Sequence, residues 1–195
     1  MGRCRHRVRG HPMTSLYPSA DIVDQLNTVG AGDRTLIRSA FGCFPSGVAA
    51  VSAITDGYGP AVLIVSSFQV GISMDPPLVL FAVQRTSASW PHLRTTPRLG
   101  ISVLAATHRD TARRLATRGP DRFEGSDMVT TPTGAHLVRG ASLWLETSVH
   151  AEVPAGDHDV ILLEVHGIAT LPDSDPLVWQ GSSFRALTQR RREES

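Results

Sequence analysis

The sequence contains no lysine, so all 19 of its basic residues are arginines. Only two cysteines occur, Cys4 and Cys43, which are too few for a disulfide framework or a zinc site and are typical of a reducing compartment. No apolar run reaches the roughly 20 residues of a membrane-spanning helix, and no apolar segment of a secretion signal follows the basic N-terminus. We therefore expect a cytoplasmic protein without a membrane partner.

Recognisable catalytic motifs are also missing. The chain has no phosphate-binding glycine loop, no Rossmann fingerprint, no nucleophile elbow and no His-Glu-x-x-His zinc motif. Ser66 and Ser67 adjoin without the turn that exposes a catalytic serine, which argues against a serine hydrolase. His150, His158 and His166 recur every eight residues and could share one face of paired strands. Turns between them interrupt the register, so we predict no metal site.

Length and charge limit the class of protein and the number of domains that we expect. The 19 basic and 18 acidic residues leave a formal net charge of +1, and 41% of the residues are hydrophobic. This composition is ordinary for a globular protein and gives no indication of a nucleic-acid partner. A chain of 195 residues suits one domain with a substantial core. We assign that domain to residues 33–188, between an N-terminal arm at 1–32, expected to be mobile, and a charged tail at 189–195.

Strand patterns outnumber helical ones. Asp33 is suited to cap a short helix that ends near Gly42, and Thr107 with Asp110 forms a capping-box pattern at the start of a second helix over 107–119. Branched apolar runs predict strands at 48–56, 61–68, 77–83, 99–105, 142–153, 158–170 and 177–180. These strands do not alternate strictly with helices, as a parallel sheet requires, so we predict a mainly-β antiparallel barrel with a few helices.

Polar residues gather at the ends of these strands. They are found at Ser46, Ser66, Ser67, the loop from Gln84 to Ser89, and the Gly-Asp-His corner that ends in His158. Hydroxyl groups and free backbone amides at a barrel rim suit a ligand rich in phosphate and carbonyl oxygens. Arg85 is a candidate phosphate ligand because a guanidinium offers fixed, paired donors. From the residues alone, a loop of turn-forming polar residues is an equal alternative.

Five segments in order carry a resemblance to a known family: FPSGVAAVSA, SSFQVGISMDPPLVLFAVQRTSAS, GISVLA, GASLWLETSVHAEVPAGDHDVILLEV and PLVWQGSSFRAL. Over about residues 34–188 the chain resembles the short-chain flavin reductases, the reductase partners of two-component flavin-dependent monooxygenases. The resemblance implies an FMN-binding split β-barrel of antiparallel Greek-key type that forms a homodimer. It also implies FMN or FAD in a groove near the subunit interface, NADH or NADPH as hydride donor, and transfer of reduced flavin to a separate oxygenase.

The resemblance also implies roles for individual residues. His158 matches the family histidine at the flavin and nicotinamide face, where we expect it to orient the nicotinamide or bond to the ring. The flavin-contacting positions carried over are Ser46, Ile64, Val65, Ser66, Ser67, Arg85, Ser87 and Ser89. Arg85, Ser87 and Ser89 fall in the loop on the phosphate side. Phe123 either walls the pocket or belongs to the core.

The chain departs from the family pattern in one strand, in the segment that follows it, and near Leu163, where a family glycine is replaced. Val62, Leu63 and Ile64 stand where family members commonly have Gly-Met-Thr, and the segment 68–76 is one residue longer than usual, which predicts a bulge. Two alternatives to a flavin reductase therefore stay open. One is a divergent enzyme on this barrel that keeps flavin bound or takes an organic substrate without flavin. The other is a non-catalytic binding protein with this fold.

Overall fold

The computed structural model describes residues 26, 28–30, 32–185 and 187. The chain divides into two units, residues 1–37 and 38–195, and every strand lies in the second unit. Helix α1 (Arg34–Gly42) begins directly after Asp33 and ends at Gly42, as predicted. Most of the expected N-terminal arm and all of the charged tail lie outside the described residues.

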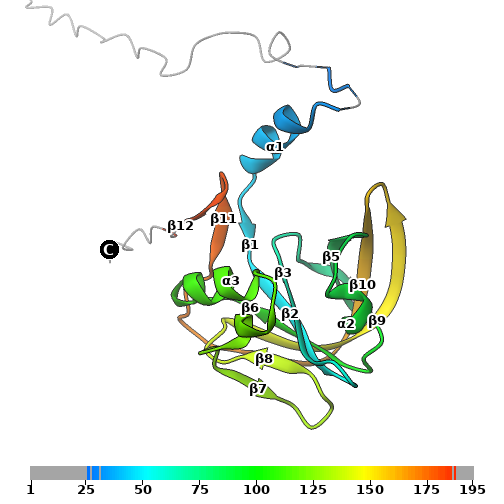
Figure 1. Ribbon diagram of the computed structural model, residues 1–195, viewed down its shortest axis with the longest axis vertical. Coiled ribbons are helices and arrows are strands. Elements are labelled where there is room, and N and C mark those ends of the chain that lie inside the picture. The colour runs from blue at the N-terminus through cyan, green and yellow to red at the C-terminus, as the bar shows by residue number, and fades with distance from the viewer. Residues whose placement is uncertain (1–25, 27, 31, 186, 188–195) are drawn as a thin grey trace, which may run out of the picture. The chain divides into compact units, whose positions relative to one another are not determined.

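Seven strands form one antiparallel sheet in the order β3-β2-β6-β9-β10-β5-β4 (Figure 1). Their bounds are β2 Ala49–Thr55, β3 Gly59–Val65, β4 Gln69–Met74, β5 Pro77–Gln84, β6 Leu99–Val103, β9 Leu143–Ala155 and β10 His158–Thr170. The edge strands β3 and β4 are joined by only three residues, 66–68, so the sheet must curl to bring its two edges together. The Ser67 hydroxyl holds this corner, because it donates to the Ala82 carbonyl at 3.0 Å and accepts from the Ala82 N–H at 2.9 Å. The expected split barrel is confirmed.

Short strands complete the second unit. They are β1 Ser46–Gly47, β11 Val178–Gln180 and β12 Ser183–Arg185 in one small sheet, and β7 Met128–Thr130 with β8 His136–Val138 in another. The sequence patterns identified β11 but not β1, β4, β7, β8 or β12. None of these five strands is longer than six residues, and most of their residues are at least partly exposed, so they lack the apolar run that marks a core strand.

The predicted helix over 107–119 is shorter than expected. A 3-10 turn, η2 (Ala106–His108), precedes α3 (Arg109–Leu115), and a second turn, η3 (Pro120–Phe123), follows it. Thr107 does not cap the helix, because it lies inside η2 and an N-cap residue needs a non-helical backbone. Instead, Nδ1 of His108 accepts a hydrogen bond from the Ala105 N–H at 3.1 Å.

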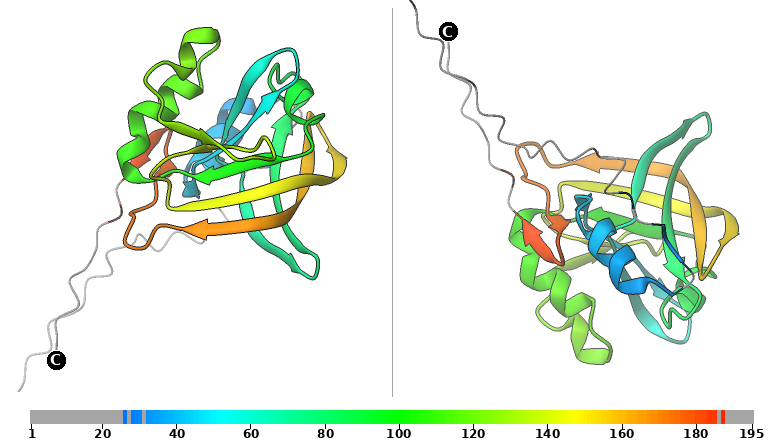
Figure 2. Two further views of the ribbon diagram at one scale, coloured as in Figure 1. Left: turned by 90° about the horizontal axis from the view of Figure 1, so that it is seen from below. Right: turned by 90° about the horizontal axis from the view of Figure 1, so that it is seen from above.

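Strands β9 and β10 form a long curved hairpin that both views in Figure 2 show. Its register shifts twice, so that His150 on β9 and His166 on β10 are each left without a partner in the ladder. The three regularly spaced histidines have different partners. The His150 ring lies 3.7 Å from Glu164, the His166 ring bonds to Ser148, and His158 begins β10. No metal-binding cluster occurs among the residues that the structure describes.

Alternation along β2 divides the core into two clusters. Ala49, Val51 and Ala53 contribute to one, which includes Phe81, whereas Val48 and Ala50 contribute to the other. Successive strand residues point to opposite faces, so the clusters lie on the two sides of β2. The second cluster contains Val62 of β3 together with Ala112 and Leu115 of α3. It thereby fixes the end of α3 beside β3.

Candidate functional site

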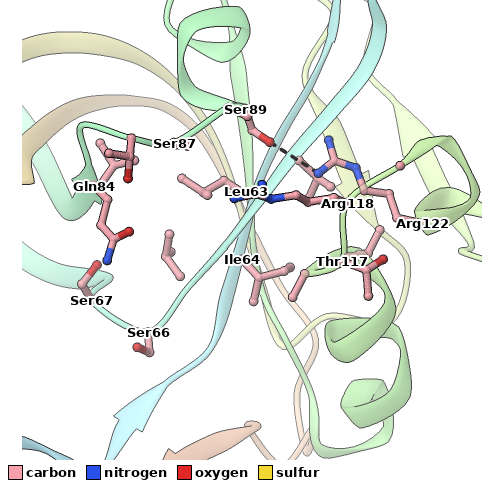
Figure 3. Close-up of a pocket in the computed structure, with 18 of the residues that line it drawn as sticks. Leu63, Ile64, Ser66, Ser67, Gln84, Ser87, Ser89, Thr117, Arg118 and Arg122 are labelled. Carbon is pink, nitrogen blue, oxygen red and sulfur yellow. Dashed lines mark hydrogen bonds between the residues drawn. The ribbon is translucent and has the colours of Figure 1, made fainter. Parts of the chain in front are cut away.

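A cavity of about 960 Å³ lies along β3. Its walls come from four parts of the chain: β3 with the preceding Tyr58 and the following Ser66 and Ser67, the end of β5 with the loop to α2 (Trp90–Leu93), the segment from the end of α3 through η3, and the first residue of β10. Figure 3 shows Ser66, Ser67 and Gln84 on one side of the cavity and Arg118 and Arg122 on the opposite side. The volume is at the upper end of the range for small-molecule sites.

The neutral end of the cavity consists of Ser66, Ser67, Gln84 and His158. Gln84 and His158 are direct partners in the β5–β10 ladder, so strand pairing places both side chains here. The His158 Nδ1 atom lies 2.6 Å from Asp157 Oδ1, and this contact fixes the orientation of the half-buried imidazole ring. Ser66 is exposed, whereas the Ser67 hydroxyl is engaged with the backbone of Ala82. This end offers hydrogen-bonding groups without a fixed charge.

The cationic end consists of Ser89, Arg118 and Arg122. The Arg122 guanidinium donates to the Ser89 hydroxyl at 3.4 Å and lies 5.1 Å from the centre of the Phe123 ring. Burial lowers the pKa of Arg122, and the nearby Tyr58 acts in the opposite direction. An arginine remains charged at neutral pH despite such a shift. Two guanidinium groups and a hydroxyl at one end of a cavity suit a phosphate group.

An apolar wall, formed by Leu63 on one face of the edge strand β3 and Ile64 on the other, lies between the two ends. In Figure 3, Leu63 and Ile64 lie between the pair Ser66 and Ser67 on one side and the two arginines on the other, and both are half-buried. Val62 is only 1% exposed and belongs to the core beneath α3. The predicted bulge is present, because the β4–β5 register shifts between Gln69 and Ser73. The departure from the family pattern therefore makes this wall apolar without closing the cavity.

The structure brings most of the predicted site residues together. Those that line the cavity are Ile64, Val65, Ser66, Ser67, Ser87, Ser89, His158 and Phe123. Ser46 and Arg85 do not line it. Ser46 pairs with Trp179 in the small sheet, and the Arg85 Nε atom forms an ion pair with Asp159 Oδ1 at 3.0 Å. Phe123 both lines the cavity and packs against the second core cluster, so its two predicted roles coincide.

Sequence reasoning missed Arg118, Arg122 and Tyr58 as lining residues. Arg118 lies at the end of the helix predicted over 107–119, Arg122 follows that helix, and both stand among other arginines, so the sequence singles out neither. Gln84 belongs to the polar loop that the sequence placed at the rim, and it faces His158 because the two predicted strands pair end to end. None of the helices that the structure describes is long and apolar enough to span a membrane.

Comparisons with known proteins agree with this geometry. Residues 41–188 match the family model described as the flavin reductase like domain. The actinorhodin polyketide dimerase of Streptomyces coelicolor is 38% identical over 157 residues, covering 80% of this chain and 88% of that protein. The reductase subunit HsaB of a flavin-dependent monooxygenase from Rhodococcus jostii is 29% identical over 155 residues, covering 80% of this chain and 78% of that protein.

A solved structure extends the likeness to the cavity-bearing fold. The Streptomyces globisporus NADH:FAD oxidoreductase SgcE6, in complex with NAD and FAD fragments, superposes with a TM-score of 0.77 at 32% identity. The match covers 85% of this chain and 99% of that structure. The family model spans the entire seven-stranded sheet and every residue of the neutral and cationic ends. This chain therefore belongs to the flavin reductase like domain family.

Proposed function

We propose that this protein is an NADH-dependent flavin reductase that supplies reduced flavin to a partner oxygenase. The observation that carries the proposal is that one cavity combines a neutral end, an apolar wall and a cationic end. A flavin nucleotide has the same three parts: a ring edge with hydrogen-bonding atoms, a flat apolar ring face and a phosphate. The relatives named as a monooxygenase reductase subunit and an NADH:FAD oxidoreductase support the same reaction and partner.

The residues present fit a flavin. Leu63 or Ile64, on the two faces of β3, would offer an apolar contact to the ring, and Ser66 and Gln84 are exposed donors and acceptors at the neutral end. Arg118, Arg122 and Ser89 would hold the phosphate, in place of the Arg85 expected from the resemblance. The Ser87 hydroxyl accepts a hydrogen bond from the Trp90 N–H at 3.3 Å and so shapes the loop that carries Ser89.

A bound flavin would supply the redox chemistry, with a nicotinamide as the hydride donor. The protein contributes position and exclusion of water. His158 would orient the ring or the nicotinamide through its Nε2 atom, because Asp157 engages the Nδ1 atom. The apolar wall would limit the access of water to the reacting groups, and the cationic end would hold the phosphate and so help to position the ring.

A second candidate is an enzyme that takes an aromatic organic substrate without flavin. The specific observation that favours it is the 38% identical relative named as a polyketide dimerase, together with the apolar side chains of Leu63 and Ile64 at the centre of the cavity. On this reading the cationic end would hold an acidic group of the substrate. A flavin requirement separates the two candidates.

One experiment tests the proposed function. Purified protein is mixed with NADH or NADPH and with FMN or FAD, and nicotinamide oxidation is followed by absorbance. We expect flavin-dependent oxidation of NADH and micromolar binding of flavin in a separate fluorescence titration. If no flavin accelerates the oxidation and none binds, the reductase function is rejected and the second candidate is favoured.

We also propose a cytoplasmic homodimer. Strand β4 is an edge strand, and Val70, Ile72 and Met74 along it are 51%, 39% and 86% exposed. Unpaired edges with exposed apolar side chains are typical of surfaces that pack against a partner. Light scattering after size-exclusion chromatography measures the mass directly, and Met74→Glu is expected to shift it from dimer to monomer.

The exposed free thiol of Cys43 suits a reducing compartment, which supports the cytoplasmic location.

A further inference from the structure

Tyr58 stands at the turn between β2 and β3 and lines the same cavity. It lies between Gly57 and Gly59, whose φ angles of 73° and 83° are in the left-handed region that glycine adopts readily. The Thr55 hydroxyl donates to the Gly59 carbonyl at 2.9 Å across this turn. The backbone that carries the tyrosine is therefore held in a defined turn, although the side chain is 56% exposed.

A second ring supports the tyrosine. The His92 imidazole of α2 stacks on it, with ring centroids 3.9 Å apart and planes inclined by only 12°. Tyr58 lines the cavity whereas His92 does not, so the histidine stands behind the phenol ring. Two stacked rings at a solvent-facing cavity wall form a preorganised surface for a further flat ring, because little side-chain freedom is left to lose on binding.

The stacked pair lies next to the cationic end. Helix α2 carries His92, and Ser89, which bonds to Arg122, directly precedes that helix. Tyr58 is also near enough to Arg122 to influence its pKa. Along β3, Tyr58 and Ser66 are eight residues apart, a distance of about 26 Å at 3.3 Å per residue. A ligand whose ring lies at Ser66 and whose phosphate lies at Arg122 would need a second ring beyond the phosphate to reach Tyr58.

We propose that Tyr58, backed by His92, is a stacking platform for the adenine of a dinucleotide whose phosphates lie at Arg118 and Arg122. This inference rests on the proposed function and makes it more specific: the site distinguishes dinucleotides from mononucleotides. Both FAD and NADH contain an adenine, so either ligand could stack on the platform. We expect the adenine to come from the flavin, because one extended FAD would run the length of β3.

Binding of FAD and FMN in the absence of NADH tests the platform. Each flavin is titrated by fluorescence against wild-type protein, Tyr58→Ala, Tyr58→Phe and His92→Ala. We expect Tyr58→Ala to weaken FAD binding by about tenfold, the usual scale of one stacked base, and FMN binding by less than about twofold. Tyr58→Phe keeps the ring and is expected to retain FAD affinity, and His92→Ala is expected to give an intermediate loss.

Ile54→Ala is the matched control. Ile54 is on the same hairpin, is 40% exposed and does not line the cavity, so it reports any general effect of removing an apolar side chain. We expect this variant to bind both flavins as the wild type does. Equal losses for FAD and FMN in Tyr58→Ala, or a similar FAD loss in Ile54→Ala, would overturn the platform while leaving the reductase function intact.

A second measurement identifies the source of the adenine. With FMN as the flavin, the KM for NADH is compared between wild type and Tyr58→Ala. An unchanged KM with weakened FAD binding assigns the platform to the flavin. A raised KM with unchanged FAD binding assigns it to the nicotinamide dinucleotide, and no change in either rejects it. If the wild type binds no flavin and oxidises no NADH, the proposed function fails and the platform with it.

Discussion

The two ends of the cavity are built in different ways. The neutral end arises from strand pairing, because Gln84 and His158 face each other across the β5–β10 ladder and the two serines directly follow β3. The cationic end arises from packing, because Arg118 and Arg122 follow α3, and Arg122 reaches Ser89 beside a helix of only four residues. One end is therefore fixed by the backbone and the other by side-chain and loop contacts.

This difference predicts a division of roles. Charge-assisted hydrogen bonds to a phosphate are roughly twice as strong as bonds between neutral groups, so the cationic end is expected to dominate flavin affinity. The neutral end has no fixed charge but holds the rigid, backbone-anchored groups nearest the ring. It is expected to govern the rate of hydride transfer through orientation.

The largest effect is expected from Arg122→Ala. Removing the guanidinium deletes a charge-assisted contact to phosphate, so we expect the Kd for FMN and FAD to rise by about 10- to 100-fold. Fluorescence titration measures this change. Riboflavin, which has no phosphate, is expected to lose much less affinity in the same variant.

Arg109→Ala is the control for the loss of one positive charge, because Arg109 is exposed on α3 and does not line the cavity. It is expected to bind flavin as the wild type does. If Arg122→Ala weakens riboflavin as much as FMN, the residue is not a phosphate ligand and the comparison between the ends fails.

A smaller effect is expected from His158→Ala, and it concerns turnover rather than flavin affinity. We expect turnover at saturating NADH and flavin to fall by about tenfold, because an orienting group is lost, while the flavin Kd changes by less than about twofold. Steady-state kinetics and a binding titration on the same preparation separate the two quantities. Unchanged turnover would remove His158 from the reaction, and a larger change in Kd than in turnover would place it with the affinity-determining residues.

The smallest effect is expected between the ends, at the apolar wall. Ile64→Thr restores a hydroxyl where the family pattern has threonine, and one added hydrogen bond is expected to lower the flavin Kd by about two- to tenfold. Ile64→Val has nearly the same shape without the hydroxyl and is the matched control. Equal affinity in the threonine and valine variants would show that this departure from the family pattern is neutral.

The neutral end could be predicted from the sequence because its residues adjoin long apolar strands. The pattern over 158–170 matches β10 residue for residue, so His158 was placed correctly at the start of that strand. Arg85 shows the limit of this reasoning. It stands in the expected loop, but Asp159, which is next to His158, holds its guanidinium in an ion pair outside the lining of the cavity.

The sequence by itself determined the class of fold, the long strands and the corner that carries His158. Alternation of apolar and polar residues is a local property, and a buried strand cannot change its register without exposing its core face. Only the tertiary structure decided which arginines reach the cavity and that Tyr58 meets His92. Those contacts join a turn, a short helix and the segment after α3, and the physical reason is packing between segments that share no local periodicity.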